Sequence, residues 1–189
     1  MFTIEDISNQ SSQSFLLAKI HKDNYPSIHF SSHLPLSVLN DLYLSFFGNS
    51  LILIAKDNNI PCGFVIGGKK EDIFFKYSYI SYLKILLAYI LNPIFLINKV
   101  LSLISPNNNF KSCSTRIFSI CISSNYSKSG LGTLLINKIE KEFKENGVTC
   151  YGLSVNSKNY IAIKFYNKNG FQKLRKNGQN IFFEKSLSN

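Results

Sequence analysis

Arginine is scarce in this sequence of 189 residues. Only Arg116 and Arg175 occur among 21 basic residues, and the 11 acidic residues leave a formal net charge of +10. Arginine is the usual reader of base edges and a common phosphate clamp, so a surface dominated by lysine argues against specific nucleic-acid recognition. The lysines are spread along the chain without a run. We therefore expect no nucleic-acid partner, and a basic surface that is either only solvated or attracts an anionic cofactor, substrate or membrane.

The sequence also lacks a secretory signal and a paired-cysteine motif. Residues 1–7 contain neither the basic segment nor the apolar segment that opens a signal peptide. The cysteines show no Cys-x-x-Cys spacing, and two of them lie inside apolar runs. We expect buried, reduced thiols in a cytoplasmic protein, and no metal site. The four cysteines are Cys62, Cys113, Cys121 and Cys150.

The chain has no apolar run of the length that crosses a membrane. Residues 77–91 and 94–104 are nearly all apolar, but Lys76, Lys84, Lys99 and Pro93 cut the run short, whereas a transmembrane helix needs about 20 uninterrupted apolar residues. This pattern predicts two buried or interfacial helices. The stretch could be extra core or a homodimer interface, a roof over an acceptor pocket, or a contact with a membrane surface that brings lysines near the lipid head groups.

Outside this stretch, the hydrophobic pattern changes repeatedly between the periods of strands and of helices. The length favours a single domain over residues 1–189. The order of the elements predicts an α/β domain with a mixed sheet. We expect strands over residues 2–7, 51–56, 60–68, 117–122, 148–155, 171–174 and 181–185, and helices over residues 12–23, 35–47, 131–146 and 158–168.

A loop rich in serine and glycine lies between a predicted strand and a predicted helix. It reads Ser127-Lys128-Ser129-Gly130-Leu131-Gly132 and is followed by Thr133. A diphosphate could use the unsatisfied amides and the positive dipole end of the helix, and glycines let the backbone approach it. A tight turn without a ligand is the alternative. The loop is neither a dinucleotide fingerprint nor a P-loop, because the third glycine and the Gly-Lys-Ser/Thr ending are missing.

A second motif follows the next predicted strand. It reads Asn159-Tyr160-Ile161-Ala162-Ile163-Lys164-Phe165-Tyr166-Asn167-Lys168-Asn169-Gly170-Phe171. This stretch resembles the N-x-x-A-x-x-F/L-Y-x-x-x-G-F signature of the GNAT superfamily of N-acetyltransferases. The loop is similar to that family's Q/R-x-x-G-x-G/A, with Ser127 in the place of Gln or Arg. The resemblance covers residues 114–175 and implies a mixed, mostly antiparallel central sheet flanked by helices. Residues 73–110 are then a helical apolar insertion.

The resemblance also implies acetyl-CoA as co-substrate, without a metal, and direct transfer of an acetyl group to a primary amine. Backbone groups of Ile120, Cys121 and Ile122 would pair with the pantetheine arm. Asn159 would meet the pantetheine or the acetyl end, unless it is only a helix cap. Tyr166 would present its hydroxyl to the CoA sulfur as a proton donor, unless it only packs on the sheet. The pyrophosphate would lie on the amides of Ser127, Lys128, Ser129, Gly130, Leu131, Gly132 and Thr133.

The general base is not evident from the sequence. Many relatives carry a glutamate on the strand before the loop, whereas residues 115–124 here hold no carboxylate and no histidine. We expect Ser119 to face the cleft, where it could order a water that relays the proton. Glu71 and Asp72 could instead reach the acceptor side, or form a solvated turn. The remaining candidates, which are more commonly surface or packing residues, are His21, His29 and His33.

These patterns together predict an acetyl-CoA-dependent N-acetyltransferase that works through a ternary complex. The acceptor could be an amino sugar, including a nucleotide-linked one, a small polyamine-like metabolite, or the N-terminal or lysine amine of a protein. The positive net charge favours a phosphate-bearing acceptor. The alternative is a non-catalytic acyl-CoA-binding or membrane-peripheral module, because the strand carboxylate is missing and the insertion is apolar. We expect a cytoplasmic location, with a membrane-peripheral one as the alternative.

Overall fold

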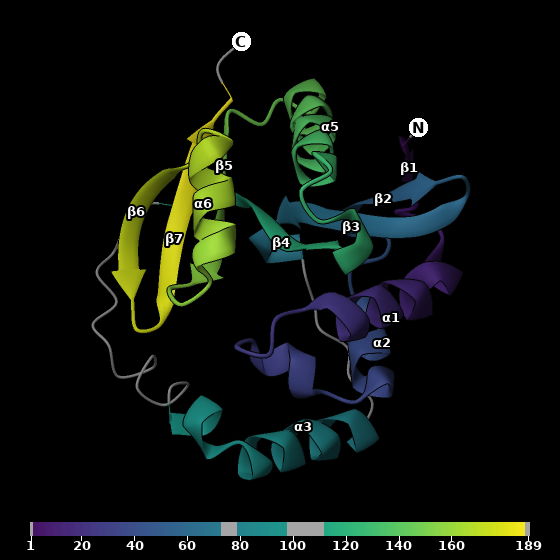
Figure 1. Ribbon diagram of the computed structural model, residues 1–189, viewed down its shortest axis with the longest axis vertical. Coiled ribbons are helices and arrows are strands. Elements are labelled where there is room, and N and C mark those ends of the chain that lie inside the picture. Colours follow the sequence, from purple (N-terminus) through teal and green to yellow (C-terminus); the bar gives the residue numbers. More distant parts are fainter. Residues whose placement is uncertain (1, 73–78, 98–111, 188–189) are drawn as a thin grey trace.

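The computed structural model describes residues 2–72, 79–97 and 112–187. Within these ranges, seven strands form one sheet. Helices cover both of its faces, and the elements are arranged as Figure 1 shows. In the order in which they neighbour one another, the strands are β1 (Phe2–Asp6), β2 (Leu51–Asp57), β3 (Ile60–Lys69), β4 (Thr115–Ile122), β5 (Cys150–Asn156), β7 (Asn180–Ser186) and β6 (Gln172–Asn177).

Three helices lie on one face of the sheet: α1 (Ser14–Asn24), α2 (Leu36–Leu44) and α3 (Tyr79–Leu91). The short helical turns η1 (Ser11–Gln13) and η2 (Phe30–His33) precede α1 and α2. Apolar side chains at helical spacing face the sheet, so this layer has its own core. That core includes Leu17, Ala18, Val38, Leu39, Tyr43, Ile52, Ile54, Phe64 and Ile66.

Two helices cover the other face: α5 (Leu131–Glu145) and α6 (Tyr160–Lys168). The apolar residues Leu131, Leu135, Ile139 and Phe143 of α5 are buried, because they recur every four residues and so lie on one side of the helix. Gly147, with φ of 72°, follows the end of α5 in the left-handed conformation that commonly terminates a helix. The core of this layer includes Leu131, Leu135, Ile139, Phe143, Leu153, Val155, Ile181 and Phe183.

The contact between β4 and β5 is short. These two strands run parallel and are joined by a crossover through α5, as a parallel pair requires. Their register contains two residue pairs, Thr115 with Tyr151 and Arg116 with Gly152. All other neighbouring strands of the described sheet are antiparallel and pair over five residues or more. The sheet is therefore split between β4 and β5 beyond Arg116.

A bulge lies at the same place in β4. Ile66 of β3 pairs with Ser119, whereas Gly67 pairs with Ile117, so Phe118 is an extra residue in β4. An extra residue shifts the side-chain alternation by one position. Phe118 and Ser119 consequently both lie on the α1–α2 face, and the side chain of Ile120 returns to the α5–α6 face.

The predicted fold class is confirmed: the sheet is mixed, mostly antiparallel and flanked by helices. Differences occur at the ends of elements. The helix expected over residues 35–47 ends at Leu44, and the strand expected from 148 begins at Cys150. In the apolar stretch, α3 and residues 93–97 are helical and lie at the surface. The predictions for 73–78 and 98–110 lie outside the described residues. Among those described, no helix has the length and apolar character to cross a membrane.

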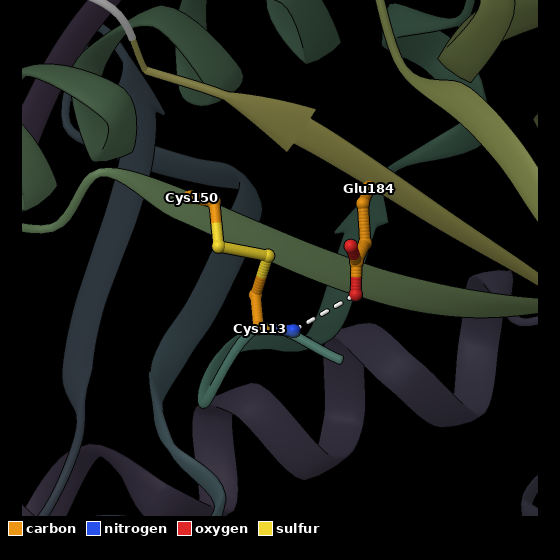
Figure 2. Close-up of a disulfide and its surroundings, with 3 residues drawn as sticks. All are labelled: Cys113, Cys150 and Glu184. Atoms are coloured by element: carbon orange, nitrogen blue, oxygen red, sulfur yellow. Dashed lines mark hydrogen bonds between the residues drawn. A yellow bond between two sulfur atoms is a disulfide. The ribbon is translucent and has the colours of Figure 1, made fainter. Parts of the chain in front are cut away.

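The expectation of four reduced cysteines is wrong. Cys113 and Cys150 form a disulfide, with their Cα atoms 5.8 Å apart (Figure 2). Each residue lies close before the parallel pairs of β4 and β5, so the crossover through α5 brings two distant positions together. Cys62 and Cys121 are buried free thiols, as expected. The cysteine pattern therefore gives no support to a cytoplasmic location.

Candidate active site

The glycine loop, residues 127–132, turns the chain from the short helix η4 (Ser124–Tyr126) into α5. Gly130 is the N-cap residue of α5 and has a φ of 85°, and Lys128 has a φ of 64°. Side chains disfavour this left-handed region, and glycine avoids the cost. A Cβ at Gly130 would meet nothing within 4 Å, so the backbone conformation, and not the space, requires glycine here.

Ser129 holds this turn together from inside. Its hydroxyl donates to the carbonyl of Tyr126, at 2.7 Å, and accepts from the amide of Leu131, at 3.3 Å. A serine in such a turn satisfies backbone groups that would otherwise need solvent. The hydroxyl of Ser129 therefore shapes the loop, and its backbone amide has its own bond to the carbonyl of Tyr126, at 3.3 Å.

The first turn of α5 presents amides at the loop. The first bond of the helix runs from the amide of Leu134 to the carbonyl of Gly130, at 3.1 Å. The amides of Gly132 and Thr133 precede that bond and point out of the helix end. Lys128 is exposed beside them. Backbone donors, the positive end of the helix dipole and one lysine give this end of α5 the properties of an anion site.

Gly132 has a different purpose from Gly130. A Cβ at Gly132 would lie 2.9 Å from the Cδ1 atom of Ile122 and 2.9 Å from the Cε2 atom of Phe165. Such distances are too short for real Cβ atoms, so a side chain here would push α5 away from β4 and α6. The sequence expectation that both glycines open space for a phosphate is therefore refined: Gly132 opens space for protein side chains.

The three β4 residues expected to meet pantetheine form the end of the strand. Ile120, Cys121 and Ile122 pair on one side with β3. Their other side faces the gap, because the register with β5 stops at Arg116. The thiol of Cys121 is directed into the α1–α2 layer, 3.7 Å from the carbonyl of Ile20, and burial raises its pKa to about 12. A thiol held neutral in this way is a poor nucleophile.

Asn159 caps α6. Its side-chain oxygen accepts from the amide of Ala162, at 3.1 Å, and the amide of Asn159 donates to the carbonyl of Asn156, at 2.8 Å. The alternative role that the sequence left open for Asn159 is therefore present in the structure. An N-cap places the side chain at the helix end, so a contact with pantetheine stays a prediction.

Tyr166 lies on the inner side of α6. Its ring makes edge contacts with Phe165 and Phe171, with centroids 5.3 and 5.4 Å apart, and the residue is 7% exposed. Burial raises the pKa of the phenol well above its usual value, and electrostatic coupling to Tyr25 raises it further. Tyr25 directly follows α1 and packs in the core on the other face of the sheet.

Ser119 joins a cluster of hydroxyl groups at the bulge. Its Oγ atom lies 3.2 Å from the hydroxyl of Tyr43 and 3.4 Å from that of Tyr25. The hydroxyl of Tyr43 lies 2.6 Å from the Nδ1 atom of His21. The His21 ring stacks on Tyr25 with centroids 3.8 Å apart. We call these four residues the hydroxyl cluster, and it connects β4 with both helices of the α1–α2 layer.

Burial keeps the histidine of this cluster neutral. Burial, followed by the charges of His29 and Lys22, lowers the pKa of His21 to about 3. Its Nε2 atom is buried and has no hydrogen-bond partner among the described residues. Burial also lowers the pKa of His29, whose ring lies against Tyr25. A charged imidazole ring at either position would lack the hydration that stabilises its charge, so both histidines are neutral at neutral pH.

The other base candidates lie elsewhere. Glu71 and Asp72 are exposed in the turn η3 (Lys70–Asp72), which follows β3. Lys69 at the end of β3 pairs with Thr115, at the opposite end of β4 from Ile122. Asp72 lines a hollow of about 460 Å³ near the C-terminal end of α5. The Nε2 atom of His33 bonds to the carbonyl of Ser27 in an exposed loop. His21, in contrast, contacts Tyr43 and Tyr25, the two tyrosines that bond to Ser119.

The sequence did not single out the two tyrosines of the hydroxyl cluster. Tyr43 falls on the buried side of a predicted helix, and Tyr25 directly follows another. A tyrosine on a helix is commonly a core residue whose hydroxyl reaches a partner. The sequence signal was a tyrosine hydroxyl group at a position expected in the core. This signal does not indicate which strand residue the hydroxyl group contacts.

The mixed sheet, split beyond Arg116 and flanked by helices on both faces, is the fold that the sequence resemblance implies. The profile of the acetyltransferase (GNAT) family matches residues 14–171. The chain therefore belongs to the GNAT family of acetyltransferases and is an acetyl-CoA-dependent N-acetyltransferase. No curated protein matches it.

Solved structures of low sequence identity share the whole fold. The PaiA N-acetyltransferase of Thermoplasma acidophilum, in complex with coenzyme A, is 14% identical with a TM-score of 0.61 and covers 98% of this chain and 99% of its own. YncA of Salmonella typhimurium, with acetyl-CoA, is 12% identical with a TM-score of 0.61 and covers 99% and 94%. An acetyltransferase of the GNAT family from Streptococcus pneumoniae is 16% identical with a TM-score of 0.59 and covers both chains completely.

The neutral state of His21 predicts a specific acid sensitivity. Its pKa is about 3 in the folded protein and 6.5 as the unperturbed value, so between these limits the unfolded chain binds a proton that the folded protein does not. The contribution of His21 to the free energy of unfolding is therefore fully present above pH 6.5 and is lost as the pH drops toward 3. At about pH 4.5, this group alone lowers the free energy of unfolding by about 2–3 kcal/mol.

We expect His21→Gln, which keeps a polar group beside Tyr43, to have a shallower fall of Tm between about pH 7 and about pH 4.5 than the wild type. His33→Gln, in an exposed loop, should keep the wild-type slope. Equal slopes for the wild type and His21→Gln would contradict the neutral, buried state of His21.

Proposed function

We propose that this enzyme acetylates the primary amine of a small, phosphate-bearing acceptor, such as an amino sugar phosphate or a nucleotide-linked amino sugar. One observation carries the proposal: the split between β4 and β5 has an anion site at one opening and uncharged hydroxyl groups at the other. A thioester arm reaching through the split would therefore end beside the hydroxyl cluster.

The residues fit acetyl-CoA, which supplies an activated acetyl group as a thioester. The first-turn amides of α5 and Lys128 would hold the diphosphate. The edge of β4 at Ile120–Ile122 would pair with the amide groups of the pantetheine arm, in the manner of an added strand. Ser127 supplies a short, uncharged side chain where relatives have Gln or Arg, so binding depends more on backbone amides and Lys128 than in those relatives.

Two groups would serve the transfer from opposite sides of the split. Tyr166, whose raised pKa keeps it protonated, would donate a hydrogen bond to the sulfur as it departs with negative charge. Ser119, fixed by Tyr25 and Tyr43, would accept a hydrogen bond from the incoming amine or from a water that removes its proton. Neutral His21 would hold the hydroxyl of Tyr43 in place.

The surroundings of Ser119 favour an acceptor without several positive charges. The groups next to it are phenols and a neutral histidine, and the described hydroxyl cluster contains no carboxylate. A polyamine would need acidic partners to offset its charges, whereas hydroxyl groups suit a sugar. The formal charge of +10 further favours an anionic acceptor.

A thiol-release assay over matched pairs of amines tests the proposal. Each pair contains an amino sugar and the same sugar carrying a phosphate or a nucleoside diphosphate. We expect the phosphate-bearing member to have a kcat/KM about tenfold higher or more, falling as salt is added. A preference for polyamines or peptides would contradict the acceptor class. Binding of acetyl-CoA without thiol release from any amine would favour the non-catalytic alternative.

Tyr166→Phe tests the role of the hydroxyl group in the departure of the thiolate. The phenyl ring keeps the packing on Phe171, so we expect kcat to fall about 10²-fold while the KM for acetyl-CoA stays near the wild-type value. Tyr160→Phe is the matched control, because Tyr160 lies on the same helix but is 75% exposed. A kcat for Tyr166→Phe equal to that of Tyr160→Phe would remove Tyr166 from the catalytic groups.

A further inference from the structure

The guanidinium groups of the only two arginines of the chain both lie over one aromatic ring, that of Phe182. The Cζ atom of Arg116, in β4, lies 5.6 Å from the ring centroid of Phe182, and the Cζ atom of Arg175, in β6, lies 5.1 Å from the same centroid. Phe182 lies between them on β7 and pairs with Arg175 in the register. Two cations on one ring are a cation–π arrangement that orients both guanidinium groups.

This arginine pair lies on the acceptor side of the sheet. Ile181 and Phe183 face the α5–α6 layer, so Phe182 between them faces the other way. That is also the face from which Ser119 contacts Tyr25 and Tyr43. Ser154 of β5, the partner of Phe182 in the register, is exposed. Arg116 therefore lies on the same strand as Ser119, where β4 and β5 still pair, whereas Arg175 lies across the split with the exposed hydroxyl group of Ser154.

Charged neighbours of both signs act on Arg116. Burial lowers the pKa of Arg116, Glu184 raises it, and Arg175 lowers it. The carboxylate of Glu184 also accepts a hydrogen bond from the amide of Cys113, at 2.9 Å (Figure 2). The two guanidinium groups are thus close enough to repel one another, and an anion bound between them would offset that repulsion.

We propose that Arg116 and Arg175 bind the phosphate or diphosphate of the amine acceptor and so set its position relative to Ser119. This inference rests on the proposed function and adds the residues that recognise the anionic group. Guanidinium groups match phosphate oxygens with two parallel hydrogen bonds, which lysine cannot do. A chain with 19 lysines and two arginines has both arginines at this place.

The test is Arg175→Gln, assayed with an amino sugar and with its phosphate-bearing counterpart. We expect the KM for the phosphate-bearing amine to rise about tenfold or more, with the KM for acetyl-CoA and the kcat/KM for the neutral amine unchanged. Lys176→Gln is the matched control, since it removes one charge from the neighbouring, exposed position of β6. An equal effect of the two variants would overturn the inference while leaving acetyl transfer in place.

Direct binding separates this inference from the proposed function. Inorganic diphosphate is titrated by calorimetry into the enzyme saturated with CoA, so that the α5 site is filled. Binding by the wild type that Arg175→Gln weakens about tenfold, and Lys176→Gln does not, supports the arginine site even if no amine is acetylated. Absence of binding to the wild type would overturn the site.

A second, independent observation concerns the outer surface of α3 and residues 93–97. Eleven of the seventeen exposed large hydrophobic residues found in the described ranges lie here, and they include Leu86, Leu87, Ile90, Leu91 and Ile94. The opposite side of α3 is attached to α2 through a bond from Ser81 to Asp41, and Ala88 is buried. Apolar surface of this extent on one helix is unusual for a protein that meets only water.

The charge around this helix indicates its partner. The apolar stretch that contains this helix, residues 73–111, has four lysines and no Asp or Glu. Figure 1 shows α3 at the edge of the molecule, beyond α2 and away from the sheet. A second copy of the chain would bring another net charge of +10 to the contact, whereas an anionic lipid surface complements both the apolar face and the lysines.

We propose that the exposed face of α3 and residues 93–97 docks on an anionic membrane surface, in the plane of the head groups. The test is flotation with vesicles of phosphatidylcholine, with or without phosphatidylglycerol. We expect flotation with the anionic vesicles, and about tenfold weaker binding for Leu86→Glu combined with Ile90→Glu. Phe15→Glu combined with Ile60→Glu carries the same charge change at residues exposed elsewhere and should float like the wild type.

Three results would overturn this docking. The wild type could remain in solution with anionic vesicles, or the two double variants could bind equally. A homodimer that only the α3 variant dissociates, without flotation of the wild type, would assign the face to a second copy instead. Both double variants change exposed residues, and equal melting temperatures by circular dichroism confirm that each comparison is between folded proteins.

Discussion

The short parallel contact between β4 and β5 is the constraint on which the rest of the structure depends. Two residue pairs join the halves of the sheet, and the disulfide between Cys113 and Cys150 links the chain close before them. Beyond Arg116 the strands part, so this edge of β4 is not paired with β5. The bulge at Phe118 turns Ser119 toward the α1–α2 layer at that point. Without the extra residue, the side-chain alternation of β4 would turn Ser119 toward the α5–α6 layer.

The two layers of helices place different chemical groups beside this split. The α5–α6 layer supplies an anion site at its helix ends and a buried phenol, Tyr166. The α1–α2 layer supplies hydroxyl groups and a histidine that burial keeps neutral. A neutral, low-dielectric lining strengthens each directed hydrogen bond, at the cost of acid stability. The half-buried arginine pair lies outside this lining, where it would meet the phosphate of the proposed acceptor.

Local patterns were sufficient to predict most of the elements. The apolar stripe of α5 follows from helical periodicity, and the family signature placed the loop and α6 in the correct order. Contacts between distant positions were not predictable in this way. The disulfide spans 37 residues, and the meeting of Tyr25, Tyr43 and Ser119 depends on a bulge that no local propensity specifies. The pairing of both arginines on Phe182 likewise depends on strand order.

The central claim is that acetyl-CoA binds in the split between β4 and β5. Hydrogen–deuterium exchange with and without CoA measures this most directly. The account predicts slower exchange for the amides of residues 119–122 and 130–133, with little change in β1 and β2. Protection confined to the hollow near the C-terminal end of α5, or no change in either segment under saturating CoA, would contradict it.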